Sequence, residues 1–186
     1  MSRWAPDDLI AGALDGDEPA TERLIATVWP PCFRLAATVI GDRALAQDAA
    51  QEACVIVHRS VRGLRSAAAF DAWLYRIVLR EAARVRRRHP AAQEPAAEAV
   101  DTSDAGDTAA LDVWRALARL SPELRDVTVL FYFDDLTTEQ IAAILRVRHV
   151  TVRTRLVRAR ERLRGLLDDY AGAPAAARRE VQHHGV

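Results

Sequence analysis

Arginine is the residue type in this sequence that is best suited to bind a ligand through charge and hydrogen bonds. All 26 basic residues are Arg and none is Lys. Acidic residues are equally numerous, so the formal net charge is zero. The two signs are separated along the chain: segment 146–165 holds eight Arg beside one acid, and segment 76–89 holds six Arg beside one acid. A planar guanidinium can grip a phosphate and can also pair with two acceptors of guanine. The two segments therefore predict binding to nucleic acid.

The other reactive residue types do not form a catalytic or metal site. The histidines are scattered: His58, His89, His149, His183 and His184. No carboxylate pair has an acid–base partner, and no Gly-rich phosphate loop is present. Cys32 and Cys54 lack the spacing of a metal knuckle or a redox pair, so we expect two buried thiols in a reducing compartment. We expect a protein that is not an enzyme and that has no cofactor and no metal.

The hydropathy pattern argues against a membrane or secreted protein. No stretch approaches the ~18 apolar residues of a membrane span. Acids occupy the segment 1–16, where a secretion signal carries a basic region and an apolar run. We expect no membrane segment and a cytoplasmic location.

The basic segment 146–165 has the pattern of an amphipathic helix. Apolar residues three and four apart predict a long helix from about Val150 to Leu167 with one buried stripe. That stripe consists of Val152, Leu156, Ala159, Leu163 and Leu166. Upstream, Thr137 and Gln140 have the spacing of a capping box ahead of a short apolar helix. A short helix, a turn and a longer basic helix predict a helix-turn-helix, whose second helix enters the major groove. An ordinary helix with a solvated basic face is the alternative.

The whole chain predicts an all-α fold of two small helical domains. Half of the residues are hydrophobic and only 6% are aromatic, which favours small helical cores. From 90 to 108, Pro, Ala and acids replace any apolar period, so we expect a flexible acidic linker. This linker separates a helical bundle over residues 7–89 from a helix-turn-helix domain over residues 109–168. We expect a disordered tail over residues 171–186.

Local signals place helices within each domain. In the first domain, four helices can enclose one core, with a kink at Pro30-Pro31 and an N-cap at Asp42. In the second, Ser121-Pro122-Glu123 predicts the start of a helix, with Ser121 as its N-cap. The next segment, 127–133, is rich in β-forming residues, so a helix and a buried strand both fit it.

Four motifs resemble those of extracytoplasmic-function (ECF) sigma factors, which direct bacterial RNA polymerase to promoters. Segments 137–142 (Thr-Thr-Glu-Gln-Ile-Ala) and 151–160 (Thr-Val-Arg-Thr-Arg-Leu-Val-Arg-Ala-Arg) resemble region four of that family. Segments 48–53 (Asp-Ala-Ala-Gln-Glu-Ala) and 70–77 (Phe-Asp-Ala-Trp-Leu-Tyr-Arg-Ile) resemble region two. The resemblance implies a region-two domain that binds core polymerase and the minus-ten promoter element, and a region-four domain that reads the minus-thirty-five element.

The resemblance also implies which residues make two of the contacts. The minus-thirty-five residues are Arg153, Thr154, Arg155, Val157 and Arg158. The residues that dock on the coiled-coil clamp helices of the polymerase β′ subunit are Asp48, Gln51 and Glu52. For this second group, an exposed polar patch opposite a buried helix face is the alternative. An anti-sigma factor is a further partner that the family allows and that the sequence does not identify.

A third group joins an aromatic ring to arginines on the helix that starts near Phe70. Melted promoter DNA needs cations for its backbone and a flat ring or a pocket for an exposed base. We expect the minus-ten contacts to come from Trp73, Arg76, Arg80 and Arg84, and we expect Phe70 in the core. By resemblance, the loop 60–69 before this helix captures a flipped base.

The turn of the helix-turn-helix departs from the family pattern, because Arg146, Arg148 and Val150 occupy a stretch where glycines and a helix cap are usual. If Arg146 takes the left-handed backbone conformation, we expect strain of about 1–2 kcal/mol, and a missing N-cap costs about 1 kcal/mol more. The turn is then looser, or the last helix starts at a shifted residue. Alternatively, Arg146 and Arg148 are extra phosphate contacts.

Two other function classes fit part of the sequence. The C-terminal domain alone fits a helix-turn-helix transcriptional regulator that acts without polymerase core. The Arg faces also fit a helical interaction module, or an anti-sigma-like partner, that binds acidic protein surfaces. The N-terminal domain favours the sigma factor. In that reading the two domains could also fold against each other, and the acidic linker could shield the Arg faces until polymerase separates them.

Overall fold

The computed structural model describes residues 2–89 and 108–172, and within these ranges all regular structure is helical. The α-helices are α1 (Asp7–Asp15), α2 (Glu18–Ile40), α3 (Arg43–Ser60), α4 (Phe70–Arg88), α5 (Thr108–Ala118), α6 (Pro122–Tyr132), α7 (Thr138–Leu145) and α8 (His149–Gly172). Two 3₁₀ turns, η1 (Val61–Gly63) and η2 (Ala67–Ala69), join α3 to α4. The predicted all-α class is confirmed for these ranges. Most of the acidic linker, 90–107, and the tail from 173 lie outside them.

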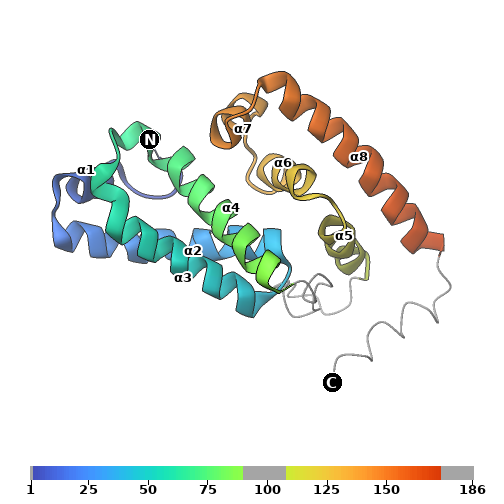
Figure 1. The fold of residues 1–186 in the computed structure, drawn as a ribbon, viewed down its shortest axis with the longest axis horizontal. Coiled ribbons are helices and arrows are strands. Elements are labelled where there is room, and N and C mark those ends of the chain that lie inside the picture. The colour runs from blue at the N-terminus through green and yellow to red at the C-terminus, as the bar shows by residue number, and fades with distance from the viewer. Residues whose placement is uncertain (1, 90–107, 173–186) are drawn as a thin grey trace.

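The first module comprises residues 2–89 and contains α1 to α4 (Figure 1). Its helices bury small and branched side chains, such as Leu24 and Val28 on α2 and Leu74 and Val78 on α4. Helix α2 continues through Pro30-Pro31 without a break. The backbone N–H of Leu45 donates to the Asp42 carboxylate at 2.9 Å, so the predicted N-cap of α3 is confirmed.

The second module comprises residues 108–172 and contains α5 to α8 (Figure 1). Segment 127–132, for which the sequence left a strand open, is helical within α6 and is held there by packing of Val127 and Leu130. Ser121 occupies the N-cap position of α6, but its side chain makes no capping hydrogen bond. The α7 capping box is confirmed, because Gln140 N donates to Thr137 Oγ1 at 3.3 Å and Thr137 N donates to Gln140 Oε1 at 2.8 Å.

Helix α8 is longer than the sequence predicted. It starts at His149, one residue before the predicted start, and it ends at Gly172 rather than near Leu167. In its predicted apolar stripe, Leu163 is half-buried and the other four residues are buried: Val152, Leu156, Ala159 and Leu166. Ala171 and Gly172, which we assigned to a disordered tail, belong to the helix.

The two modules pack against each other and share one hydrophobic core. Helix α4 lies against α7, and α2 lies against α6. The core runs from Leu24 and Leu74 in the first module to Leu130, Ile141 and Leu156 in the second. This observation confirms that the two domains can fold against each other, and we call it the closed arrangement.

A buried arginine lies in the second module, next to its contact with the first module. Arg125 of α6 is 1% exposed. Its guanidinium donates to carbonyl oxygens at the end of α5: Leu117 at 2.7 Å, Leu120 at 2.9 Å and Ala118. It also reaches Val39 O of α2 at 3.4 Å, across the module boundary. The last carbonyls of a helix lack intrahelical partners and carry partial negative charge, so they compensate this buried cation.

Candidate nucleic-acid interface

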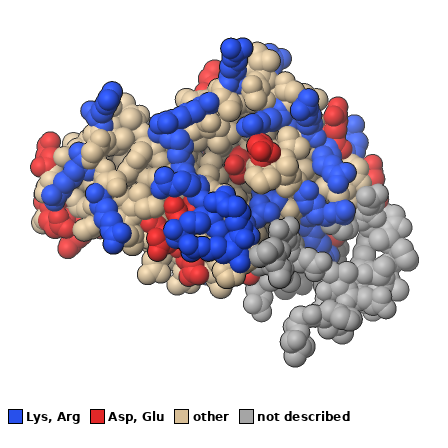
Figure 2. Space-filling view, viewed as in Figure 1, with Lys and Arg blue, Asp and Glu red and all other residues tan. Residues whose placement is uncertain are grey.

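The N-terminal half of α8 presents the predicted minus-thirty-five residues to solvent. Helix packing buries Val152, Leu156 and Ala159 and turns the other residues outward. Arg153, Thr154, Val157 and Arg158 are exposed, and Arg155 is half-buried. Figure 2 shows basic side chains along the outer side of the second module, where α8 runs. The structure therefore brings all five residues to the first turns of one helix, the part that a helix-turn-helix inserts into the major groove.

In the turn before α8, Arg146 takes the left-handed backbone conformation for which the sequence analysis expected strain. Arg146 has φ 55° and ψ 43°, which is the left-handed conformation. It ends α7 in the manner of a glycine C-cap, and its N–H donates to Ala142 O. Arg146 and Arg148 are both exposed, so their side chains remain open to solvent.

His149 links the two helices of this motif, a contact that the sequence analysis missed. Its Nε2 lies 2.7 Å from Thr138 Oγ1 and 3.0 Å from Glu139 Oε1. Both partners lie in the first turn of α7, so the imidazole ties the start of α8 to the start of α7. Arg148, the residue before His149, has no side-chain acceptor and cannot cap α8. The His149 bridge therefore holds a helix start that lacks a side-chain cap.

The predicted minus-ten residues share α4 with a strongly basic C-terminal end. Arg80 is exposed, and Trp73, Arg76 and Arg84 are half-buried. Phe70 is fully buried, as predicted, and its ring lies 5.9 Å from that of Trp73. Figure 2 shows basic side chains gathered over the end of α4. These residues therefore form a cationic surface beside one aromatic ring.

A buried carboxylate organises two of these arginines. Glu81 is 4% exposed. Arg80 Nε donates to Glu81 Oε1 at 3.2 Å, and Arg84 Nε lies 3.0 Å from Glu81 Oε2 without good hydrogen-bond alignment. Burial of an unpaired carboxylate is costly, and the positive charges of Arg80 and Arg84 offset that cost for Glu81.

The predicted polymerase face and the predicted minus-ten face meet at one ion pair. Asp48, Gln51 and Glu52 are all exposed on α3, whose opposite side is buried. Arg84 Nη2 lies 3.6 Å from Glu52 Oε2. A protein that binds Glu52 would therefore change the surroundings of Arg84.

The loop before α4 is partly occupied by contacts within its own module. Arg62 Nη2 donates to Gly16 O at 3.1 Å and to Glu18 Oε2 at 3.0 Å. These contacts hold η1 against the turn between α1 and α2, whose Gly16 has φ 87°. Arg62 and Arg65 are both exposed, but the Arg62 guanidinium is engaged in these contacts, which favours Arg65 as the DNA contact of this loop.

The module junction also carries a group of charges that the sequence did not indicate. Asp126 of α6 is half-buried, and burial raises its pKa to about 7, against the opposing effect of nearby Arg86. Arg155 also lowers the pKa of Asp126, though by less. Burial likewise lowers the pKa of Arg86. Because Arg155 belongs to the predicted minus-thirty-five group, this carboxylate links the module junction to α8.

Other kinds of site find no support in the described residues. No cluster of three or more metal-binding side chains occurs in the described ranges. Cys32 and Cys54 are both buried and free, as the spacing predicted. No helix in the described part of the chain combines the length and the hydropathy needed to cross a membrane.

Family models and known proteins match both modules. The model for Sigma-70 region 2 matches residues 24–91, and the model for Sigma-70, region 4 matches residues 110–163. The chain is 34% identical over 163 residues to the ECF RNA polymerase sigma factor SigM of Mycobacterium tuberculosis, covering 86% of this chain and 83% of SigM.

Two solved structures share the fold. CnrH in complex with the cytosolic domain of CnrY aligns with a TM-score of 0.69 and 24% identity, over 90% of this chain and 98% of the matched chain. The sigma factor RpoE of Bartonella quintana, solved with the anti-sigma factor NepR, aligns with a TM-score of 0.61 and 23% identity, over 79% of this chain and 96% of the matched chain.

Proposed function

The chain belongs to the ECF family of RNA polymerase sigma factors, and we propose on that premise how its two modules divide promoter recognition. Proteins of this family bind core RNA polymerase and direct transcription initiation, and they are not enzymes. The first module contains the region-two match and the second contains the region-four match. The single observation that carries the division is the position of the two basic surfaces, one on α4 and one on α8.

The second module reads the minus-thirty-five element through α8. Arg153, Thr154, Arg155, Val157 and Arg158 lie on the first turns of this helix and mostly face solvent. Arginine can bind guanine in two places at once, and the exposed Val157 can meet the methyl group of thymine. Loss of one base contact should cost about 1–3 kcal/mol of binding with relaxed specificity, and loss of one phosphate contact should lower the salt slope by about 1.

The first module holds melted minus-ten DNA on α4. Arg76, Arg80 and Arg84 neutralise the backbone, and Trp73 offers a ring for stacking, which is worth about 1–3 kcal/mol per base. Glu81 fixes Arg80 and Arg84 beside each other. This helix therefore supplies the cations and the ring that single-stranded DNA requires.

Asp48, Gln51 and Glu52 dock the first module on the β′ clamp helices of polymerase. All three are exposed on one helix, and the carboxylates of Asp48 and Glu52 suit a basic partner surface. The contact between Glu52 and Arg84 then couples polymerase docking to the minus-ten surface.

Reading both promoter elements requires the modules to separate. The two elements lie about 25 base pairs apart, which is about 85 Å of B-DNA at about 3.4 Å per base pair. In the closed arrangement both modules share one core. Residues 90–107 have a covalent length of about 60–65 Å at about 3.3–3.6 Å per residue, and the modules on either side must cover the rest of the distance. The closed arrangement is therefore a state of the free protein, and polymerase selects the open one.

The place of action and the regulating partner follow from the same function. A protein that binds RNA polymerase and promoter DNA works in the bacterial cytoplasm. An anti-sigma factor that binds the closed arrangement would keep the protein from polymerase. The structural neighbour from Bartonella quintana, which has the same fold, was solved in complex with an anti-sigma factor.

Co-elution with sigma-free core RNA polymerase on gel filtration tests the function. We expect the wild-type chain to co-elute and a double variant, Asp48→Ala with Gln51→Ala, to lose most of this binding. Glu22→Ala removes an exposed acid from α2 and serves as the control, because it lies outside the proposed docking surface. A wild-type chain that shifts duplex DNA at low salt but never co-elutes would instead support a regulator that acts without polymerase.

A further inference from the structure

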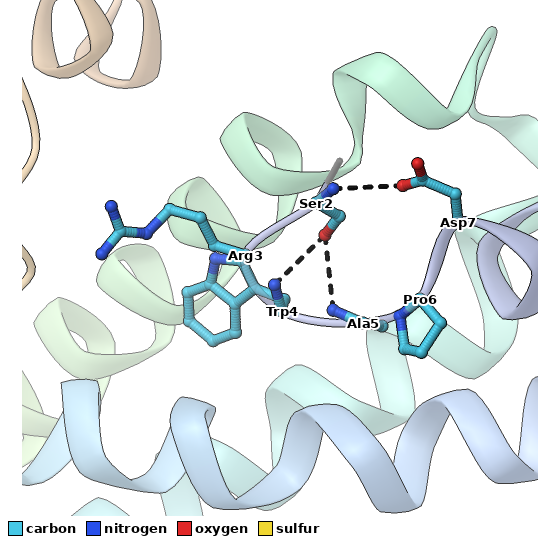
Figure 3. A pocket seen from close by; sticks show the side chains of 6 residues that line it. All are labelled: Ser2, Arg3, Trp4, Ala5, Pro6 and Asp7. Atoms are coloured by element: carbon cyan, nitrogen blue, oxygen red, sulfur yellow. Dashed lines mark hydrogen bonds between the residues drawn. The ribbon is translucent and has the colours of Figure 1, made fainter.

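The segment Ser2–Pro6 forms a small loop in front of α1, and we call it the N-terminal segment (Figure 3). Ser2 Oγ accepts hydrogen bonds from Trp4 N at 3.1 Å and from Ala5 N at 3.3 Å. Ser2 N donates to Asp7 Oδ1 at 3.1 Å. These local bonds fix the shape of the loop and hold Arg3 and Trp4 in defined directions.

One side of the N-terminal segment is attached to α4. The Asp71 carboxylate accepts hydrogen bonds from Arg3 N at 2.9 Å and from Ser2 Oγ. Trp4 is 6% exposed, and its ring and that of Tyr75 form a T-shaped pair with centroids 4.7 Å apart at an interplanar angle of 82°. The N-terminal segment therefore covers one flank of α4 with both polar and aromatic contacts.

The other side of the same segment reaches the second module. Arg3 Nη2 donates to Asp134 O, in the turn between α6 and α7, at 2.6 Å. Tyr75 and Asp134 also lie close enough for each side chain to shift the pKa of the other. Burial raises the pKa of Asp134, and the positive charges of Arg3 and Arg34 oppose that rise. Arg3, Tyr75 and Asp134 thus form one polar cluster across the module boundary.

We propose that the N-terminal segment is an intramolecular clasp, which fastens the second module to α4 through Arg3 and so restrains the opening that polymerase requires. The clasp leaves Tyr75 only 3% exposed, so this ring of the minus-ten helix is unavailable to DNA while the clasp is fastened. The effect on polymerase rests on the function proposed above, whereas the effect on the closed arrangement does not.

The size of the expected effect follows from the Arg3 contact. A hydrogen bond from a charged donor is worth enough to change an equilibrium about tenfold. Arg3 is exposed, so its removal leaves no cavity in the core. We therefore expect Arg3→Ala to raise the ratio of open to closed molecules about tenfold without changing the fold of either module.

Single-molecule FRET between the modules measures that ratio directly. One dye replaces exposed Arg59 on α3 and the other replaces exposed Arg162 on α8, each through cysteine, while buried Cys32 and Cys54 remain in place. Arg23→Ala is the control, because Arg23 bonds to Pro19 O on its own helix. We expect this control to keep the wild-type ratio.

A second variant tests the same clasp from its anchor on α4. Asp71→Asn weakens the acceptor of Arg3 N and Ser2 Oγ and should also raise the open fraction, with far-UV circular dichroism unchanged. A wild-type protein that is already mainly open would overturn the proposal. A ratio in Arg3→Ala that stays within about twofold of the Arg23→Ala control would overturn it as well, since one charged hydrogen bond should exceed that.

Titration with core polymerase tests the inhibitory role. If only the open state binds polymerase, the apparent affinity is reduced in proportion to the fraction of open molecules. Arg3→Ala raises that fraction, so it should bind core polymerase up to about tenfold more tightly. Opening without tighter binding would overturn the inhibitory role. If the wild-type chain does not bind polymerase at all, the proposed function fails, and the FRET ratio still decides whether the segment is a clasp.

Discussion

Replacement of Arg146 by glycine should stabilise the protein, although arginine ends α7 in the present sequence. Arg146 has φ 55° and ψ 43°, where a residue with a Cβ loses about 1–2 kcal/mol. Glycine removes that strain but adds about 0.4–1 kcal/mol of unfolded-state entropy. The net gain is about 0.5–1 kcal/mol, or an increase in melting temperature of about 1–4 °C for a chain of this size.

The comparison with Arg146→Ala separates the backbone from the charge. Arg146 lies near Arg76, whose pKa is lowered by burial and by the positive charge of Arg146. Both substitutions remove this repulsion, but alanine retains the left-handed strain. Urea unfolding should therefore give a glycine variant about 0.5–1 kcal/mol more stable than the alanine variant.

Arg148→Gly supplies the matched control for this test. Arg148 is exposed as well, but it does not have a positive φ. Glycine there should lower the stability through the unfolded state. The reasoning is refuted if Arg146→Gly is no more stable than Arg146→Ala, or if both glycine variants change stability by the same amount.

Two further predictions concern buried charges. Arg125→Met leaves several carbonyl oxygens unpaired and should cost about 3–4 kcal/mol, seen as a fall in melting temperature of about 10 °C; a fall no larger than that of exposed Arg119→Met would contradict this. Asp126 has a native pKa of about 7, raised from 3.8, so the native state binds more protons between these values and stability falls as pH rises from about 4 to 7. Asp126→Asn should remove that fall and raise stability at pH 8 by about 2 kcal/mol, less than the full effect of the pKa difference because the carboxyl keeps some solvent contact. Urea midpoints at pH 5 and pH 8 check this, and a variant that keeps the wild-type slope would exclude Asp126 as its source.

Local signals allowed the sequence to predict most of the helices. The Thr137–Gln140 capping box and the Asp42 N-cap depend on residues three apart, and the α8 stripe depends on one helical period. The sequence left the choice open where two local signals favoured different structures. Segment 127–132 has β-forming residues, and only its packing in the core makes it helical.

The candidate site was predictable in part for the same reason. The family resemblance indicated Arg153 and Arg158 as DNA contacts, and the helical period of α8 places both on its exposed side. The tie between His149 and Thr138 was not predicted, because it joins two helices across a turn whose path depends on Arg146. Histidine at a helix start gives no signal of its own in a single sequence.

The sequence by itself determined the helical class, the helix boundaries to within a few residues and the separation of acidic from basic segments. Only the tertiary structure decided which of these charges meet. Arg3 lies 131 residues from Asp134, and Arg125 lies 86 residues from Val39, yet each pair is in contact. Helix period and capping report on neighbours within one or two turns, whereas these contacts exist because the two modules bury one common core.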